Sequence, residues 1–285
     1  MSSTAEILGH DVDVSRASDD LVRFCRSYFE AKSGTDVDVL MAHFARESVT
    51  YGDATVGWVF RDWKTLYDQF AELLAAWPAE AVAYPTRIVG DGDSGVVFFT
   101  DSPEMFGREV RAIGTVNLRD GKAVRWVDHW DGRSLTVAGV EKLRVPLDQF
   151  PGDFGEEAFG EPSVLRKLAA ALSAGDADRV AALLGPNVVV EDLALHTLVT
   201  GRIAAHSFLR RTTLPYGAGL TVRHTVGNAQ GGAFEWASAD VPRGVTAVEL
   251  DRQGLATRIT STWDSSLWTE HDLTTAQRAT ALGAE

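Results

Sequence analysis

The sequence predicts an α+β protein made of two tandem cone-shaped domains, each with three helices packed on a curved, mostly antiparallel sheet. One observation is the order helix, helix, strand, helix and then four strands, which occurs twice. A second is a repeated hairpin, since the strands at 115–118 and 125–131 recur at 247–250 and 258–264, and both copies end in Trp-Asp. A third is that the gaps between strands are too short for helical crossovers, which favours antiparallel pairing.

The hairpin repeats at a spacing of about 130 residues, which is too long for a solenoid unit and fits two copies of one small domain. A chain of 285 residues is long for one core and comfortable for two. We therefore divide the chain into a flexible leader (1–17), a first domain (18–135), a linker (136–162), a second domain (163–268) and a tail (269–285).

Composition excludes several classes of function. The net charge of −13 argues against a nucleic-acid surface, and five lysines without a basic run argue against a membrane-surface patch. The N-terminus lacks the features of a signal peptide, and no apolar run approaches a spanning helix. We therefore expect a soluble, cytoplasmic protein. The single cysteine, Cys25, sits among apolar residues and is interpreted as buried filler.

In the first domain, Ser18 begins a helix in which Leu21, Phe24, Cys25 and Tyr28 recur at helical spacing, up to residues 33–34. A short helix follows from residue 36, then a strand at 48–53 and a loop at 54–60. The segment 61–77 has the widest apolar stripe and ends before a proline. Strands are predicted at about 81–89, 94–101, 108–119 and 122–131.

The linker contains apolar residues, so we expect it to pack against a domain; these are Leu143, Leu147, Phe150, Phe154 and Phe159. The second domain repeats the order, with a tail interpreted as a frayed helix. Its predicted helices are 163–174, 176–184 and 202–213, and its predicted strands are 187–192, 219–226, 232–239, 245–251 and 255–264.

This order of elements, with the terminal Trp-Asp strand, resembles the nuclear transport factor 2-like superfamily over 18–135 and 163–268. That group includes SnoaL-like polyketide cyclases, ketosteroid isomerase, limonene epoxide hydrolase and polyether epoxide hydrolases. The tandem arrangement looks like the two-domain polyether enzymes and also like duplicated SnoaL-like proteins. The resemblance implies an apolar pocket in the mouth of the cone. It also implies an internal pseudo-dimer of the two domains, with a homodimer as a further possibility.

The resemblance also implies site residues. Isomerases and polyether enzymes of this group place a tyrosine in the first helix and an aspartate after the first strand, which Tyr28 and Asp53 match. A second carboxylate just after the third helix is matched loosely by Glu80. The second copy has leucines, Leu168 and Leu172, where its first helix would need the tyrosine. The first pocket is therefore the expected catalytic one, and the second domain a scaffold or degenerate copy.

In an apolar cone, Asp53 would lose hydration, which raises its pKa toward that of a general base. Tyr28 would donate a hydrogen bond to an oxyanion or an epoxide oxygen. The alternative interpretation is that Asp53 caps a turn beside Gly52 and that Tyr28 belongs to the core.

His129 and Asp131 lie two residues apart on one predicted strand, so their side chains share a face and could form a proton relay. The alternative is a structural pair at the sheet end, which the repeat favours because Thr262 replaces His129 while Asp264 repeats Asp131. Substrate contacts are expected from aromatic residues of the first domain, although core packing is the competing explanation for most of them. These are Tyr51, Trp58, Trp63, Trp126 and Trp130.

The sequence thus favours a cyclase that needs no cofactor and no metal, acting on a large, apolar, polyketide-derived molecule by acid–base-assisted ring formation or epoxide opening. His196, His206 and His224 are too scattered to predict a metal site. Two rivals remain. One is a pericyclic cyclase that only shapes its substrate, and the other is a non-catalytic ligand-binding or interaction protein.

Overall fold

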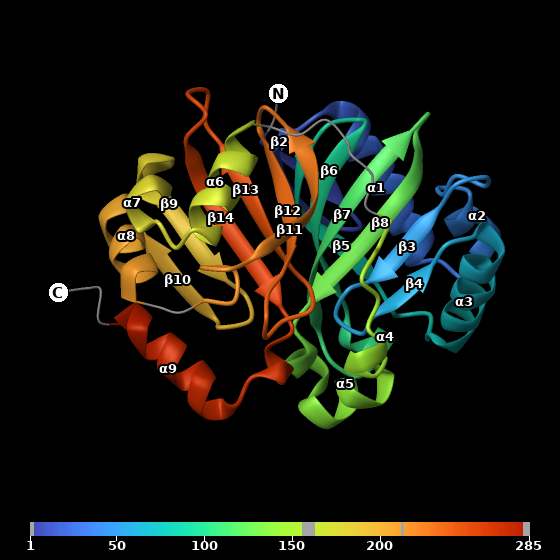
Figure 1. The fold of residues 1–285 in the computed structure, drawn as a ribbon. Helices are drawn as coiled ribbons and strands as arrows, with labels where there is room; N and C mark the ends of the chain where they lie inside the picture. Colours follow the sequence, from blue (N-terminus) through green and yellow to red (C-terminus); the bar gives the residue numbers. More distant parts are fainter. Residues whose placement is uncertain (1–2, 156–162, 212–213, 282–285) are drawn as a thin grey trace.

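A computed structural model describes residues 3–155, 163–211 and 214–281. Within these residues the chain forms two sheets, of eight and six strands, each with helices packed on one face (Figure 1). The strand orders are β1-β2-β5-β6-β7-β8-β3-β4 and β10-β9-β14-β13-β12-β11. Pairing is antiparallel except at β2–β5, β3–β8 and β14–β9. The predicted α+β class with two mostly antiparallel sheets is therefore confirmed.

The helices of the first domain begin where polar side chains can cap them. Ser18 accepts a hydrogen bond from the amide of Leu21 at the start of α1, and Asp62 accepts one from Thr65 at the start of α3. The elements of this half are β1 (Thr4–Ile7), β2 (His10–Ala17), α1 (Asp19–Lys32), α2 (Val37–Met41), β3 (Thr50–Asp53), β4 (Trp58–Phe60), α3 (Trp63–Ala76), β5 (Ala83–Gly90), β6 (Ser94–Asp101), α4 (Pro103–Phe106), β7 (Val110–Arg119), β8 (Lys122–Trp130), η1 (Gly132–Leu135), α5 (Val137–Leu143) and η2 (Leu147–Gln149).

The second domain repeats this plan without counterparts of β1 and β2. Its elements are α6 (Ser163–Ser173), α7 (Ala177–Ala182), β9 (Leu184–Asp192), β10 (Thr197–Thr200), α8 (Arg202–Arg211), β11 (Thr221–Asn228), β12 (Gly231–Ala237), β13 (Gly244–Leu250), β14 (Ala256–Trp263), η3 (Ser265–Leu267) and α9 (Glu270–Ala281). A separate core lies inside each cone.

The predicted flexible leader is wrong for residues 3–17, because this segment forms the β1–β2 hairpin. Strand β2 pairs in parallel with β5, and Ile7 and Val12 are fully buried against the first core. The remaining side chains are mostly polar because the hairpin lies at the edge of the sheet. Pairing with β5 therefore orders a segment whose sequence by itself only weakly indicates a strand.

Two further expectations are corrected. Part of the predicted 54–60 loop is β4, which pairs with β3 and extends the sheet. The tail is more than a frayed end, since α9 buries Leu273 and Ala276 on the second core, and Gln277 donates a hydrogen bond to the carbonyl of Leu195. No helix in the described ranges has the length and apolar character needed to cross a bilayer.

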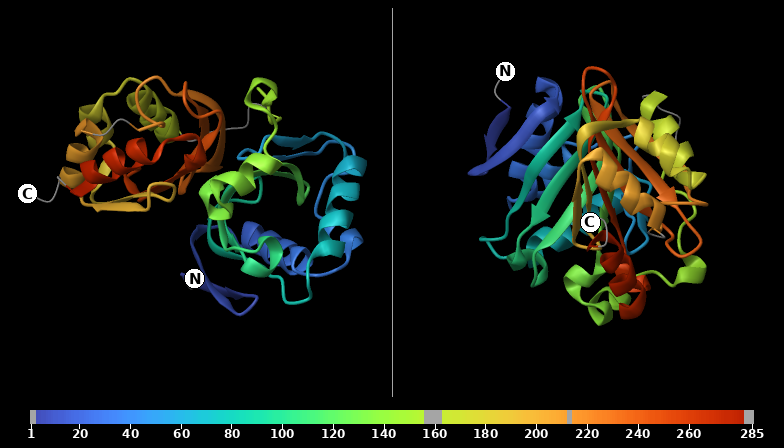
Figure 2. Two further views of the ribbon diagram at one scale, coloured as in Figure 1. Left: turned by 90° about the horizontal axis from the view of Figure 1, so that it is seen from below. Right: turned by 90° about the vertical axis from the view of Figure 1, so that its left-hand side faces the viewer.

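The two sheets pack against each other through their outer faces, and helices lie on the far sides (Figure 2). An apolar cluster joins β5, β6 and β7 of the first domain to β11, β12 and β13 of the second. Its members are Val89, Val96, Phe98, Ile113, Val226, Ala233, Val245 and Ala247.

A buried ion pair crosses this contact. Arg125 of β8 makes two parallel hydrogen bonds, of 2.6 and 2.7 Å, to the carboxylate of Glu235 in β12, and the hydroxyl of Thr115 donates a third. The linker closes the same region, as expected, because Phe154 is fully buried and its carbonyl accepts a hydrogen bond from Arg125. Phe159 lies outside the described residues.

Candidate active site in the first cone

A cavity of about 260 Å³ opens inside the first cone. Side chains from α1, β3, β4, α3, β6, β7 and β8 line it, together with residues from η1 and α5. Most of the wall is apolar and aromatic, so a bound molecule would be largely removed from water. The aromatic lining comprises Tyr51, Trp58, Phe60, Phe70, Trp77, Phe99, Phe106 and Trp130.

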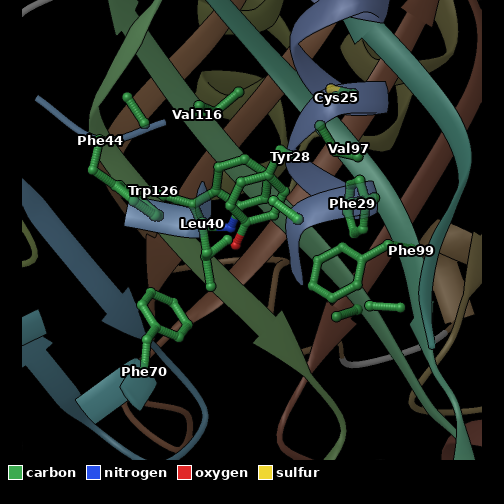
Figure 3. Packing of buried hydrophobic residues seen from close by; sticks show 14 of the residues in the cluster. Cys25, Tyr28, Phe29, Leu40, Phe44, Phe70, Val97, Phe99, Val116 and Trp126 are labelled. Carbon is green, nitrogen blue, oxygen red and sulfur yellow. The ribbon is translucent and has the colours of Figure 1, made fainter. Parts of the chain in front are cut away.

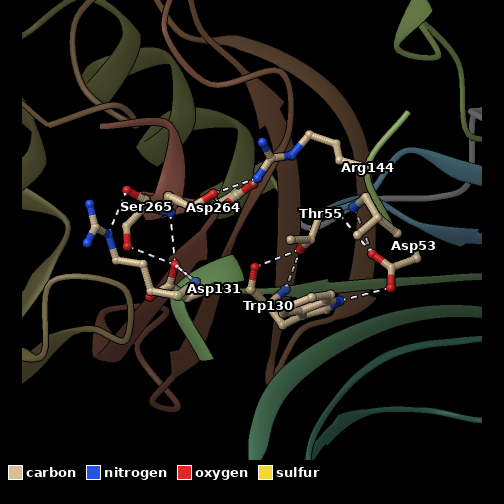
Figure 4. A network of polar contacts seen from close by, with 10 residues as sticks. Asp53, Thr55, Trp130, Asp131, Arg144, Asp264 and Ser265 are labelled. Carbon is tan, nitrogen blue, oxygen red and sulfur yellow. Dashed lines mark hydrogen bonds and ion pairs between the residues drawn. The ribbon is translucent and has the colours of Figure 1, made fainter. Parts of the chain in front are cut away.

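Asp53 stands at the end of β3 with its carboxylate facing this cavity. One oxygen accepts hydrogen bonds from the amides of Thr55 and Val56 (3.0 and 3.2 Å), and the other from the indole of Trp130 (2.9 Å; Figure 4). Burial raises the pKa of Asp53 to about 7; the Trp130 hydrogen bond opposes this rise, and the charge of Asp128 adds to it. This carboxyl group can therefore both give and take a proton near neutral pH.

Asp128 is the residue that sequence reasoning missed. It pairs in register with Asp53 across the parallel β3–β8 contact. Its oxygens accept hydrogen bonds from the Tyr51 hydroxyl (2.5 Å) and the Trp126 indole (2.6 Å). Burial raises the pKa of Asp128 to about 6, while the positive charge of Lys32 opposes the rise. The alternation of β8 could have revealed this residue, because Asp128 shares a face with the already selected Trp126 and Trp130.

A second missed feature is a buried ion pair at the cavity wall. The ammonium of Lys32, in the last turn of α1, lies 2.8 Å from the carboxylate of Asp101 in β6. It also lies 4.6 Å from the ring centre of Phe99. Both charged groups line the cavity. The pair contributes no net charge, and its positive end lies close enough to Asp128 to lower that pKa.

Tyr28 lies in the aromatic core beside the cavity and does not line it. Its ring stacks on Trp126 with centres 4.4 Å apart, and Phe29 and Phe44 pack around it (Figure 3). Among the described residues its buried hydroxyl has no hydrogen-bond partner. Burial raises the pKa of Tyr28 well above its usual value, and the charge of Asp128 adds to the rise. Tyr28 therefore lies beside Asp128 and not in the cavity wall, where we expected it to contact substrate.

The remaining predicted residues divide by position. Tyr51, Trp58 and Trp130 line the cavity as expected. Trp63 stacks instead on Tyr67, outside the lining. Trp126 is fully buried and serves to hold Asp128.

Glu80 is exposed after the third helix and does not line the cavity, so its predicted place in the cone is corrected. The physical reason is that Glu80 lies in a turn between α3 and β5, where its side chain is exposed to water.

His129 and Asp131 share a face, as predicted, but it is the face toward the second domain. His129 is buried near Arg125 and Glu235, and burial lowers its pKa to about 4. Asp131 accepts hydrogen bonds from the amide and hydroxyl of Ser265, 2.9 and 2.8 Å away (Figure 4). Neither lines the cavity, so the expected proton relay at the pocket wall is corrected to a contact between domains.

The second cone keeps only part of this arrangement. Asp192 ends β9 and accepts hydrogen bonds from the indole of Trp263 (3.2 Å) and the amide of Leu195 (2.8 Å), as Asp53 does from Trp130 and its own turn. Register places Ser261 opposite Asp192, where the first cone has Asp128 opposite Asp53.

No protein-family model matches the chain, and no curated protein matches it in sequence. Solved structures do resemble it. One is an NTF-2 like protein of unknown function from Burkholderia xenovorans, with 15% identity, a TM-score of 0.34, and coverage of 39% of this chain and 83% of that one.

Two others are similar to a comparable degree. A hypothetical protein with a ketosteroid isomerase-like fold from Catenulispora acidiphila, in complex with trimethylamine, has 17% identity and a TM-score of 0.36, over 47% of this chain and 99% of its own. A candidate polyketide cyclase from Sinorhizobium meliloti has 22% identity and a TM-score of 0.33, over 39% and 99%. Proteins described as NTF2-like, ketosteroid isomerase-like and polyketide cyclase-like are thus among the structural neighbours of this chain.

Proposed function

We propose that the first cone is a cofactor-independent catalyst of acid–base chemistry on an apolar, polyketide-derived small molecule, closing a ring or opening an epoxide. The observation that carries the proposal is the pair of carboxyl groups of Asp53 and Asp128, which occupy neighbouring strands in one apolar cavity. Their environments move their pKa values to about 7 and about 6. Within the described residues, only Asp128 has a nearby cation, Lys32, that favours its ionised form, and carboxyl groups in environments that differ in this way typically divide acid and electrostatic roles.

Asp53 is the proton-transfer group. In its protonated form it gives its proton to the epoxide oxygen as the carbon–oxygen bond breaks. A hydroxyl of the same molecule attacks the carbon, and its proton returns to Asp53, so the reaction is an isomerisation in which atoms and electrons balance. Asp128 stays ionised and stabilises the positive charge that develops at the carbon. Tyr51 and Trp126 hold that carboxylate in place.

The test uses apolar epoxides that carry an internal hydroxyl group, with ring-closed products measured by mass spectrometry. We expect Asp53→Asn to lower turnover by roughly 10²–10⁴-fold, the usual contribution of a general acid–base group. Asp192→Asn is the matched control, because each amide would meet the indole N–H of a tryptophan, Trp130 or Trp263. Equal activity of both variants would contradict the proposal.

A specific observation keeps one rival open: the aromatic wall could shape a flexible substrate without proton transfer. In that case Asp53→Asn and Asp128→Asn would both keep turnover. Replacement of Trp58 by alanine would instead lower it, because the indole spans the cavity wall and α5, where it donates a hydrogen bond to the carbonyl of Leu143.

A further inference from the structure

Three carboxylates line the cavity, and two of them, Asp53 and Asp128, have no ion-pair partner in the described part of the chain and make hydrogen bonds that all suit the ionised form. Asp53 accepts from two backbone amides and one indole, and Asp128 accepts from a phenol and an indole. Four of these five donors are N–H groups, which cannot accept a proton from a neutral carboxylic acid. These hydrogen bonds therefore favour the ionised form at both positions, whereas burial opposes it.

No cation among the described lining residues is left to neutralise that charge. The charged groups of the lining are Lys32, Asp53, Asp101 and Asp128. Lys32 is hydrogen-bonded to Asp101, so these two offset each other. Buried charges in proteins are normally paired, because removal from water is costly without a partner. The raised pKa values of Asp53 and Asp128 reflect the cost of burying these groups, which the charge of Lys32 offsets only in part at Asp128.

The rest of the cavity independently suits a positively charged apolar group. Aromatic rings surround it, and their faces attract cations. Lys32, placed over the ring of Phe99, is an internal example of that contact.

We propose that the first cavity selects an apolar amine in its protonated form, with the ammonium group paired to Asp128 and the hydrocarbon body against the aromatic wall. The proposal rests on the proposed function, because it concerns the same cavity. It adds the substrate class, which is a molecule with a basic nitrogen beside the reacting centre. Asp53 stays free for proton transfer. A molecule with a free carboxylate is rejected, because it would add a further negative charge to the cavity.

The first experiment compares the binding of benzylamine, benzyl alcohol and benzoate by titration calorimetry at about pH 8, where model carboxyl groups are ionised and amines are protonated. These probes have a similar ring and differ in charge. We expect benzylamine to bind at least tenfold more tightly than benzyl alcohol, and benzoate not to bind. Equal affinity for amine and alcohol, tighter binding of benzoate, or no binding by any probe would each overturn the inference.

Variants locate the charge. Asp128→Asn should bring the amine-to-alcohol ratio close to one, because the charge is lost while the amide oxygen can accept from the Trp126 indole and the amide NH2 can donate to the Tyr51 hydroxyl. Asp53→Asn should lower the ratio less, and Asp192→Asn in the other cone should leave it unchanged. If Asp128→Asn retains the full ratio, the site of the cation is not this cavity.

Acid offers a second readout. The preference for amine should fall as pH drops below about 6, where Asp128 takes up a proton. The groups that face Asp128 from other elements are Lys32 and Tyr28 of α1, Tyr51 and Asp53 of β3 and Asp101 of β6. These assays measure binding alone, so they can be separated from turnover. If the protein shows no preference for the amine but turns over the epoxide, this inference is wrong and the proposed function stands. If it prefers the amine but shows no turnover, the proposed function is wrong and this inference stands.

Discussion

In the first cone an indole, that of Trp130, donates to Asp53, and in the second cone Trp263 donates to Asp192 in the same way. The residue opposite the aspartate then differs: Asp128 in the first cone and Ser261 in the second. Ser261 is satisfied by a neutral hydroxyl partner 2.9 Å away on Thr246. The second cone therefore carries one carboxylate where the first carries two.

The interiors differ in the same sense. In the second cone Tyr216, Trp236 and Trp263 are all buried, and Trp268 packs on Trp263 with ring centres 4.7 Å apart. A cavity of about 210 Å³ in this domain is lined by residues of α6, α7, α8 and the segments beside them, and neither Asp192 nor Ser261 lines it. In the first cone the aromatic residues stand around a cavity. The comparison teaches that the Trp-Asp hydrogen bond belongs to the fold, whereas the second carboxylate and a cavity lined by the aspartates belong to the first site.

The largest expected effect tests what the two cones share. Arg125→Met leaves Glu235 buried without its cation, and we expect a loss of about 3–5 kcal/mol in the free energy of unfolding. Urea denaturation measures it. The double variant with Glu235→Leu should recover much of the loss, because it removes both charges. A single variant as stable as the parent would show that the cones do not depend on this pair.

The next effect separates the cones by the pH dependence of stability. The pKa of Asp128 rises from 3.8 to about 6 on folding, so the folded state binds more protons than the unfolded state between these values. Stability from this group is present at low pH and falls as pH rises through that window. Asp128→Asn should therefore gain up to about 3 kcal/mol above pH 7 and almost nothing below about pH 4.

Asp192→Asn provides the contrast, measured by the same urea titrations at several pH values. Its amide would face the indole N–H of Trp263, so the gain should be smaller, although the pKa of Asp192 is also raised to about 6 by burial. A gain for Asp128→Asn that does not change with pH would refute the charge-based explanation.

A smaller effect distinguishes two tyrosines of the first cone. Tyr51→Phe removes a hydrogen bond to a carboxylate, which costs about 1.5–3 kcal/mol and should raise the pKa of Asp128, as followed by NMR of its side chain. Tyr28→Phe removes a hydroxyl without a partner among the described residues and should change stability by less than about 0.5 kcal/mol. Equal losses of stability in both variants would argue against a hydrogen bond that only Tyr51 makes to Asp128.

The smallest effect concerns Glu80. Because the side chain is exposed and lies outside the cavity, Glu80→Gln should change stability by no more than about 0.5 kcal/mol and leave turnover unaltered. Comparison with Asp53→Asn in the same assay is the check. A large loss of turnover would return Glu80 to the site.

Particular residues show how far sequence pattern could go. The helical stripe of α3 and the alternation of β7 and β8 are strong local signals, and both elements form as predicted. The hairpin at 4–17 and the helix at 270–281 were missed or undervalued because their order comes from docking on a sheet or core. Asp53 was found through the family resemblance, whereas Asp128 was overlooked in favour of its neighbour His129.

The sequence by itself determined the duplication, the α+β class and the alternation of side chains along each strand, because these follow from local periodicity and from the repeat. Only the tertiary structure decided which face of β8 meets the cavity and which meets the second domain. The alternation of side chains along a strand defines two faces, but it does not show which face meets the cavity. The choice depends on what packs on each side: α1 and α3 over Asp128, and Glu235 of the second sheet over Arg125 and His129.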